Sequence, residues 1–423
     1  MRKLFTLFLA FMLLCLTGAS ALADALTIAG LDPKTMIHPS VSDHDTGLLP
    51  ALWLSEWQSR YPGVPLDADN DFPYRSTSAL LRALESGDTR DVLMFPSYNY
   101  DWNALKASGS LRDLSDDPEL VALVAGMRAP FVEAAYHEGK LYGIPCGITL
   151  GLGTMRYDVE AWTLAGYTEA DMPASLTSLV DFLESWAERC RREPATGVCV
   201  TNILESYSAA DHTSWLTEYI IDLYAQQCRA QGLSASFDTP EFVALLERLP
   251  ALGQALSESD PVKDSTHCLL ESFIRDGDMP YYIPTRLNDG DPQLIPVYIS
   301  ILCVPEKGGN ADAAMDFLRL YTDCVRNHTY DDSTAITFWD CEAIRTRALV
   351  FEGAPGTVPS PADHMWLTAD ELAAIQPLTG RMRVVSGYAA IPYLKENTQR
   401  INQFASGRLT AQELARQLIT DRD

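Results

Sequence analysis

The stretch that decides the fold runs from residue 91 to residue 120 and reads DVLMFPSYNYDWNALKASGSLRDLSDDPEL. It opens on an apolar run, Asp91 to Phe95, whose length suits a buried strand. A polar and aromatic loop follows directly, from Ser97 to Trp102. In a parallel α/β sheet, ligands bind at the carboxyl ends of strands, so this loop is a candidate ligand site.

Upstream of this stretch, strand and helix patterns alternate. Residues 25–31 and 64–68 are short apolar runs that predict strands. Between them, residues 46–60 carry apolar side chains at helical spacing, and a second helix is expected from Ser76 to a stop at Gly87. Repeated β-α-β units with short connections predict an α/β fold with a mainly parallel sheet.

Several motifs resemble those of one protein family. Residues 109–114 (GSLRDL) and 139–145 (GKLYGIP) are similar to the patterns G-x-L-x-D-L and G-K-x-Y-G-I-P of the maltose-binding-protein-like extracellular solute-binding proteins, family 1, of bacterial ABC importers. Weaker matches follow in the family's order, at residues 153–158, 164–166, 173–182, 273–279, 295–301, 311–321 and 404–418. The pattern departs at Leu176, where the family has Trp.

The resemblance implies a two-lobe periplasmic-binding-protein fold of type II, each lobe a mainly parallel sheet flanked by helices. The chain would cross between the lobes near residues 144–149, 294–300 and 326–334. Residues 24–145 and the return segment 294–330 would form the first lobe, and residues 146–293 and 331–423, with the C-terminal helices, the second. Hinge closure would trap a small solute for delivery to the transmembrane subunits of an ABC permease. The resemblance implies no catalysis, no cofactor and a monomer.

The N-terminus has the pattern of an export signal. Two cations precede an apolar run at residues 4–16, and Ala21-Leu22-Ala23 forms a cleavage site. Removal of residues 1–23 would leave Asp24 at the N-terminus of a protein exported to the periplasm or the extracellular face of the cell membrane. Lipidation of Cys15 is the alternative, although Leu14 stands where a lipoprotein signal needs a small residue.

The charge balance excludes one class of partner. Lys and Arg total 32 against 57 for Asp and Glu, which gives a formal net charge of −25. A chain this acidic has no basic surface for a nucleic-acid backbone or an anionic membrane. We therefore expect no nucleic-acid partner.

The cysteines permit disulfides in an exported chain. Cys190 and Cys199 are the best pair, because Pro194 and Gly197 between them favour a turn. No C-x-x-C motif occurs, which argues against a zinc knuckle or a thioredoxin-type site.

Enzyme and metal motifs are missing or incomplete. The sequence lacks G-x-S-x-G, H-E-x-x-H and the P-loop pattern. The spacing of Asp67, Asp69 and Asp71 imitates a calcium loop, but Phe72 replaces the glycine that such a loop needs. We expect no metal and no catalytic residue, with a secreted hydrolase as the less favoured alternative.

The candidate ligand-binding residues lie in loops that follow strands or lie near the crossings. They are Asp43, His44, Asp45, Asp69, Asn70, Asp71, Tyr98, Tyr100, Asp101, Trp102, Asn202, Tyr207, Tyr281, Tyr282 and Trp339. These loops are rich in Asp, Asn and Tyr and poor in Arg, which favours a carbohydrate or polyol over an anion. A cationic solute such as a polyamine is the next choice, because Asp with aromatic rings also suits cations. An exported sensor subunit without transport would have the same sequence pattern.

Three aromatic residues of this set form the sharpest expectation. If residues 97–102 stay extended, alternation places Tyr98, Tyr100 and Trp102 on one side, where they would form a ligand platform. The alternative is that Tyr98 and Trp102 cap the core of the first lobe.

Overall fold

The computed structural model describes residues 25–30, 56–69, 72–150, 155–156, 159–192, 198, 208–259, 269–270, 282–283, 286–327, 379–387 and 391–420. The predicted export signal lies outside these residues. In chain order the strands are β1 (Leu26–Ala29), β2 (Leu66–Asp69), β3 (Val92–Pro96), β4 (Tyr136–His137), β5 (Lys140–Leu141), β6 (Ile144–Leu150), β7 (Met155–Arg156), β8 (Tyr282–Ile283), β9 (Ile295–Cys303) and β10 (Met382–Val384). The helices are α3 (Thr77–Ser86), α4 (Trp102–Ala107), α5 (Pro118–Ala125), α6 (Ala129–Ala135), α7 (Val159–Leu164), η1 (Glu169–Asp171), α8 (Leu176–Arg192), α9 (Ala209–Ala230), α10 (Pro240–Ser259), α11 (Ala311–Asn327), η2 (Ile391–Tyr393), α14 (Lys395–Ala405) and α15 (Ala411–Gln417).

The strands expected before residue 96 form one side of the main sheet. β1 pairs in parallel with both β2 and β3, as the β-α-β pattern predicted. Helix α3 between them begins and ends where its sequence indicates. The Ser76 hydroxyl accepts from the backbone N–H of Ala79 at 3.2 Å, and Gly87 adopts a left-handed φ of 76°.

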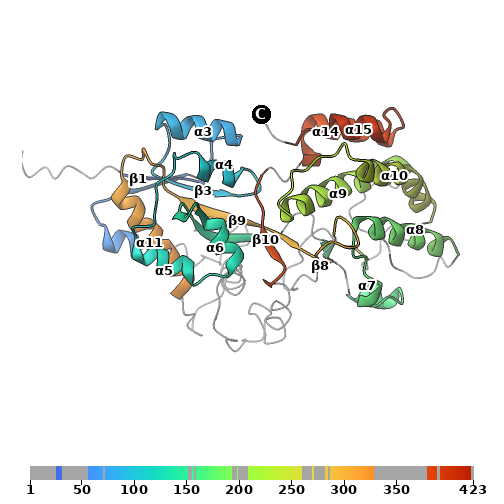
Figure 1. Ribbon diagram of the computed structural model, residues 1–423, viewed down its shortest axis with the longest axis horizontal. Helices are drawn as coiled ribbons and strands as arrows, with labels where there is room; N and C mark the ends of the chain where they lie inside the picture. Colours follow the sequence, from blue (N-terminus) through green and yellow to red (C-terminus); the bar gives the residue numbers. More distant parts are fainter. Residues whose placement is uncertain are drawn as a thin grey trace, which may run out of the picture.

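The long strand β9 joins the two halves of the molecule (Figure 1). Its C-terminal end pairs antiparallel with β3, its N-terminal end pairs in parallel with β10, and β6 runs antiparallel along its other edge. The main sheet is therefore mixed, with order β10-β9-β3-β1-β2. β6 and β9 cover nearly all residues of the first two expected crossings, and most of the third, residues 326–334, lies outside the described residues, so the crossings stay predictions. β10 joins this sheet too, although it comes from the interval 331–423 that was expected in the second lobe.

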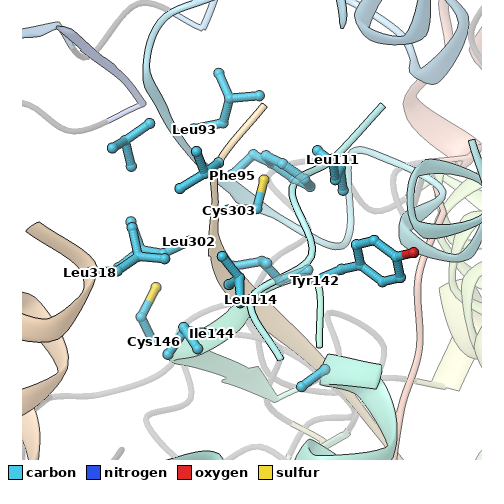
Figure 2. Packing of buried hydrophobic residues seen from close by; sticks show 14 of the residues in the cluster. Leu93, Phe95, Leu111, Leu114, Tyr142, Ile144, Cys146, Leu302, Cys303 and Leu318 are labelled. Atoms are coloured by element: carbon cyan, nitrogen blue, oxygen red, sulfur yellow. The ribbon is translucent and has the colours of Figure 1, made fainter. Parts of the chain in front are cut away.

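Two separate hydrophobic cores correspond to two lobes. The first core lies around the main sheet, and Figure 2 shows part of it, with Phe95 and Leu93 of β3 beside Leu302 and Cys303 of β9. The second core lies among helices α8, α9, α10, α14 and α15, on the right of Figure 1. Each lobe therefore buries its own set of apolar side chains.

The second lobe is mainly helical where the structure describes it. Its described strands are the antiparallel pair β7 and β8. Helix α9 begins at a capping box: the Ser208 hydroxyl accepts from the N–H of Asp211, whose carboxylate in turn accepts from the N–H of Ser208.

One sequence prediction, the Cys190–Cys199 disulfide, is only partly within the described residues. Cys190 is buried in the second core, whereas Cys199 lies outside the described residues, so their pairing stays a prediction. No helix in the described ranges is long and apolar enough to cross a membrane.

Candidate functional site at the lobe junction

Many of the predicted ligand-binding residues lie outside the described residues. They are Asp43, His44, Asp45, Asn70, Asp71, Asn202, Tyr207, Tyr281 and Trp339. Asp69 and Tyr282 lie on strands β2 and β8, which fixes the course of their backbone. The ligand contacts expected of all these residues stay predictions.

The aromatic loop after β3 does not stay extended. Residues 97–99 turn, and the Asp101 carboxylate accepts from the N–H of Ala104 at 3.1 Å, which starts α4 at Trp102. The expected alternation of side chains is therefore wrong. An N-cap at Asp101 competes with the extended conformation, and it prevails because it satisfies an otherwise unpaired N–H of the helix.

Tyr100 and Trp102 point into the first core. Their exposed fractions are 5% and 2%. The Tyr100 hydroxyl donates to the carbonyl of Tyr74, and Trp102 Nε1 donates to the carbonyl of Ala134 at 2.8 Å. Both rings contact Phe95 edge to face, so the geometry favours the alternative that Trp102 caps the core.

Tyr98, in contrast, lies where the two lobes meet. Its ring packs edge to face on Tyr298 of β9, with centroids 5.9 Å apart and planes at 88°. The same small apolar cluster contains Ala230 at the end of α9, Leu294 and Val385. Burial raises the pKa of Tyr98, so its hydroxyl stays protonated and able to donate.

The neighbouring Ser97 ties three segments together at this junction. Its hydroxyl donates to the carbonyl of Val385 at 2.8 Å and accepts from the N–H of Ile299 at 3.0 Å. The N–H of Gly387 lies 2.9 Å from the carbonyl oxygens of both Ser97 and Tyr100. The end of β3, the middle of β9 and the exit from β10 are therefore held in one place.

Helix α9 faces this junction with polar side chains. Its apolar side chains, including Leu216, Ile220 and Leu223, pack in the second core. A second stripe carries Tyr219, Asp222, Gln226 and Arg229, each three or four residues from the next and therefore on one face of the helix. We call these four residues the α9 row.

Three members of the α9 row hold polar atoms that are buried and lack partners. Within the described part of the chain, Tyr219 Oη, Asp222 Oδ1 and both polar side-chain atoms of Gln226 have no hydrogen-bond partner. The exposed fractions of Asp222 and Gln226 are 9% and 1%. Each such atom destabilises a fold by about 1–3 kcal/mol, so a group of them requires an explanation, and a ligand-binding role is one.

The charges of the α9 row act across the junction. Arg229 Nη1 lies 3.5 Å from the hydroxyl of Tyr298. Burial raises the pKa of Tyr298, Arg229 opposes that shift, and Asp222 adds to it. Asp222 and Arg229 are thus both within electrostatic reach of the strand that connects the lobes.

Asp222 is the one carboxylic acid among the four residues of the α9 row. Burial raises its pKa to about 7, against smaller lowering effects from the Gln226 amide and from Arg229. Gln226 lies close enough to act on the carboxylate, although the pair does not meet hydrogen-bond geometry.

An exposed aromatic ring marks the rim of this site. Tyr393, at the end of η2, is 66% exposed. Burial of its hydroxyl end raises its pKa, and the charges of Glu218 and Asp222 add to the shift. Glu218 lies on α9 one turn before Asp222, and burial raises its pKa as well. The exposed face of the Tyr393 ring therefore lies near the carboxyl groups of Glu218 and Asp222 on α9.

The site contains no arrangement suited to a metal. In the ranges that the structure describes, no group of three His, Cys, Asp or Glu side chains could hold an ion. The α9 row instead offers hydrogen-bond donors and acceptors, which are the groups that orient a small ligand in a binding site.

The sequence reasoning missed the α9 row. The signal was present, because Asp222, Gln226 and Arg229 recur at helical spacing within an otherwise apolar helix. That pattern is also typical of a solvent-exposed helix face. In the folded protein β9 and η2 pack against α9, and the sequence alone does not reveal this burial.

Comparison with solved structures places the fold among solute-binding proteins. An ABC substrate-binding protein of Listeria monocytogenes, solved with cycloalternan, has a TM-score of 0.53 at 12% identity, over 93% of this chain and 96% of that one. The GacH receptor of Streptomyces glaucescens, studied without ligand and with acarbose, has a TM-score of 0.52 at 16% identity, over 93% and 96%. A family 1 extracellular solute-binding protein of Alicyclobacillus acidocaldarius has a TM-score of 0.53 at 14% identity, over 94% and 96%.

These similarities confirm the expected fold class. The chain has the two-lobe α/β fold of type II periplasmic binding proteins. No protein-family model matches the sequence, and no curated protein is significantly similar to it. At sequence identities of 12–16%, structural similarity establishes the fold but not the function, so the function has to be argued from the residues.

Proposed function

We propose that this protein captures a neutral, polyhydroxylated solute, a carbohydrate or a polyol, between its two lobes. The observation that carries the proposal is the α9 row, whose buried polar atoms lack partners at the junction of the lobes. Hydroxyl groups both donate and accept, and so match a set that offers a phenol, a carboxyl oxygen and an amide. From Tyr219 to Gln226 the row spans about 10 Å, so the solute would present hydroxyls over that length.

The charge of the row favours a neutral solute over a charged one. Asp222 and Arg229 lie two helical turns apart on the same face, and each acts on Tyr298. A cation would be attracted by Asp222 and repelled by Arg229. An anion would be attracted by Arg229 and repelled by Asp222. When Asp222 is ionised, neither a cation nor an anion has a net advantage, whereas hydroxyl groups can bond to both side chains.

Tyr393 would supply the apolar contact. One face of a sugar ring is apolar, and exposed aromatic rings commonly hold it by stacking. Glu218 beside Tyr393 would accept from hydroxyl groups at the rim. The same acid and ring favour a polyamine as the second candidate, since a cation could lie over the ring.

Closure would take place about the strands that join the lobes. β6 and β9 run side by side through the junction, while each lobe keeps its own core. A solute that contacts the α9 row and the first lobe together stabilises the closed state, which a transporter can distinguish by shape.

The rest of the proposal concerns the cellular role. The protein would be exported after loss of residues 1–23 and act as a monomer that delivers its solute to an ABC permease. It would be a binding protein without catalysis and without a cofactor. A sensor subunit remains the alternative to a transport component, and deletion of a neighbouring permease gene with solute-uptake measurements separates them.

A ligand panel with matched variants tests the proposal. Maltose, cellobiose, xylobiose, trehalose, mannitol and spermidine would be screened by thermal shift, since a ligand that binds the folded state raises the melting temperature. Binding of a neutral compound with compaction in small-angle scattering supports the proposal. Binding of spermidine alone would replace it with the second candidate.

Gln226→Leu would link that binding to the α9 row. The substitution removes buried polar atoms without partners, so it should weaken binding while leaving stability unchanged or higher. Gln254→Leu on the exposed side of α10 is the matched control and should leave affinity unchanged. Equal affinity of Gln226→Leu and the wild type would exclude the row as the ligand site.

A further inference from the structure

We propose that binding of the solute at the α9 row is coupled to proton release, and that Asp222 is the group that loses the proton. The inference rests on the proposed function and adds its regulation: capture becomes stronger as the pH rises through neutrality. It follows from the position of one carboxyl group, buried at the lobe junction with an oxygen that lacks a partner.

The groups around Asp222 are few and come from three elements. Helix α9 itself contributes Tyr219 and Glu218 before it and Arg229 after it. The hydroxyl of Tyr298 approaches from β9 and that of Tyr393 from η2. Helices α8, α10 and α14 also pack on α9, and none of their charged groups in the described ranges acts on Asp222.

In the unliganded protein, this environment gives the Asp222 carboxyl group a pKa near neutral pH. Burial disfavours the carboxylate and raises the pKa to about 7, while Gln226 and Arg229 limit the shift. Both protonation states are therefore populated at physiological pH. A surface carboxyl group, with a pKa near 4, would be fully ionised there.

A polyhydroxylated ligand would select the carboxylate. Ligand hydroxyls that donate to Asp222 Oδ1 make charge-assisted hydrogen bonds, which are about twice as strong as bonds to a neutral acid. These bonds stabilise the ionised form and lower the pKa in the complex. The proton leaves the carboxyl oxygen for water or buffer as the complex forms, so the charge balances.

The coupling between proton loss from Asp222 and ligand binding determines how the affinity changes with pH. With a pKa of about 7 in the free protein and a lower one in the complex, the dissociation constant should fall about 10-fold from pH 6 to pH 8. At pH 7, about half a proton should be released per ligand bound.

Isothermal titration calorimetry tests the coupling directly. The neutral compound with the largest thermal shift in the panel above would be titrated into the full mature protein at pH 6, 7 and 8. Buffers of different ionisation enthalpy, phosphate and Tris, report the number of protons released. Asp222→Asn keeps an oxygen acceptor without titration, and should abolish both the proton release and the 10-fold pH dependence. Glu247→Gln, on the exposed side of α10, is the matched control and should behave as the wild type.

Each outcome supports or overturns a distinct proposal. Binding with a constant affinity from pH 6 to 8, or proton release that persists in Asp222→Asn, overturns the coupling and leaves the proposed function standing. Failure of every neutral compound to bind overturns the proposed function, and the coupling with it. Should Asp222→Asn not fold, carbon-13 NMR of the carboxyl groups of the wild type replaces it. A buried Asp that titrates between pH 6 and 8, and whose pKa falls with ligand, supports the coupling, and the absence of one overturns it.

Discussion

Replacing Trp102 with alanine distinguishes a core residue from a ligand platform. The ring is 2% exposed, lies against Phe95, and has its Nε1 bonded to the carbonyl of Ala134. A Cβ at Gly143 would lie 2.9 Å from the ring, which shows how closely the backbone approaches it. The surrounding structure therefore has little freedom to fill the space that the ring would leave.

The expected loss can be worked from these contacts. Removing a buried Trp side chain destabilises a protein by about 3–5 kcal/mol, and the lost hydrogen bond adds about 1 kcal/mol. Because whole domains are stable by only about 5–15 kcal/mol, the first lobe of Trp102→Ala should unfold at a much lower urea concentration. Affinity measured on the fraction that remains folded should stay within about 2-fold of the wild type, or about 0.4 kcal/mol.

Urea denaturation followed by circular dichroism, with calorimetric titration of a panel ligand, provides both measurements. Tyr98→Ala is the companion variant, because Tyr98 is only half-buried and faces Tyr298 at the junction. It should lose about 1 kcal/mol of stability, the value of one aromatic pair. If Trp102→Ala instead loses more than 10-fold in affinity with an unchanged urea midpoint, the ring belongs to the ligand surface and our reasoning fails.

Three further predictions concern other positions. Tyr393→Ala should weaken binding of a neutral sugar about 5-fold, the effect of about 1 kcal/mol, and leave melting unchanged because the ring is exposed; lower melting with unchanged affinity would contradict a stacking role. The buried Lys106 donates to the carbonyls of Ala134 and Tyr136, and burial lowers its pKa from 10.5 to about 8. Between those pH values the unfolded chain binds the extra proton, so the free energy of unfolding should rise with pH by up to about 3 kcal/mol in the wild type and stay flat in Lys106→Met; parallel profiles from urea titrations would refute this. Mass spectrometry of the exported protein should find Asp24 at its N-terminus, and a lipid on Cys15 would show the export signal to be of the other kind.

The sequence was sufficient where structure is local. The caps of α3 at Ser76 and Gly87 lie where the sequence predicts them, and β1, β2 and β3 fall within two residues of the apolar runs that indicate them. In these segments, backbone conformation is set by side chains a few residues away. The family motifs also indicated the fold class, which the similarity to solved structures confirms.

The sequence was insufficient where burial depends on distant segments. Whether Tyr100 faces a ligand or the core depends on Phe72, and the two rings meet only after the sheet has formed. The polar face of α9 likewise becomes buried only when residue 298 of β9 arrives. A helical stripe of Asp, Gln and Arg has the same sequence pattern whether the helix face is exposed to solvent or lies at a lobe junction.

The position of β9 has a consequence for how the protein is made. The strand that completes the sheet beside β3 begins at residue 295, about 200 residues after β3, and its neighbour β10 begins at residue 382. During translation, β3 therefore lacks its partner β9 until more than two thirds of the chain has been made, and β9 lacks β10 for longer still. Contacts of such long sequence separation form slowly. The main sheet therefore cannot be completed before the late strands β9 and β10 have been made.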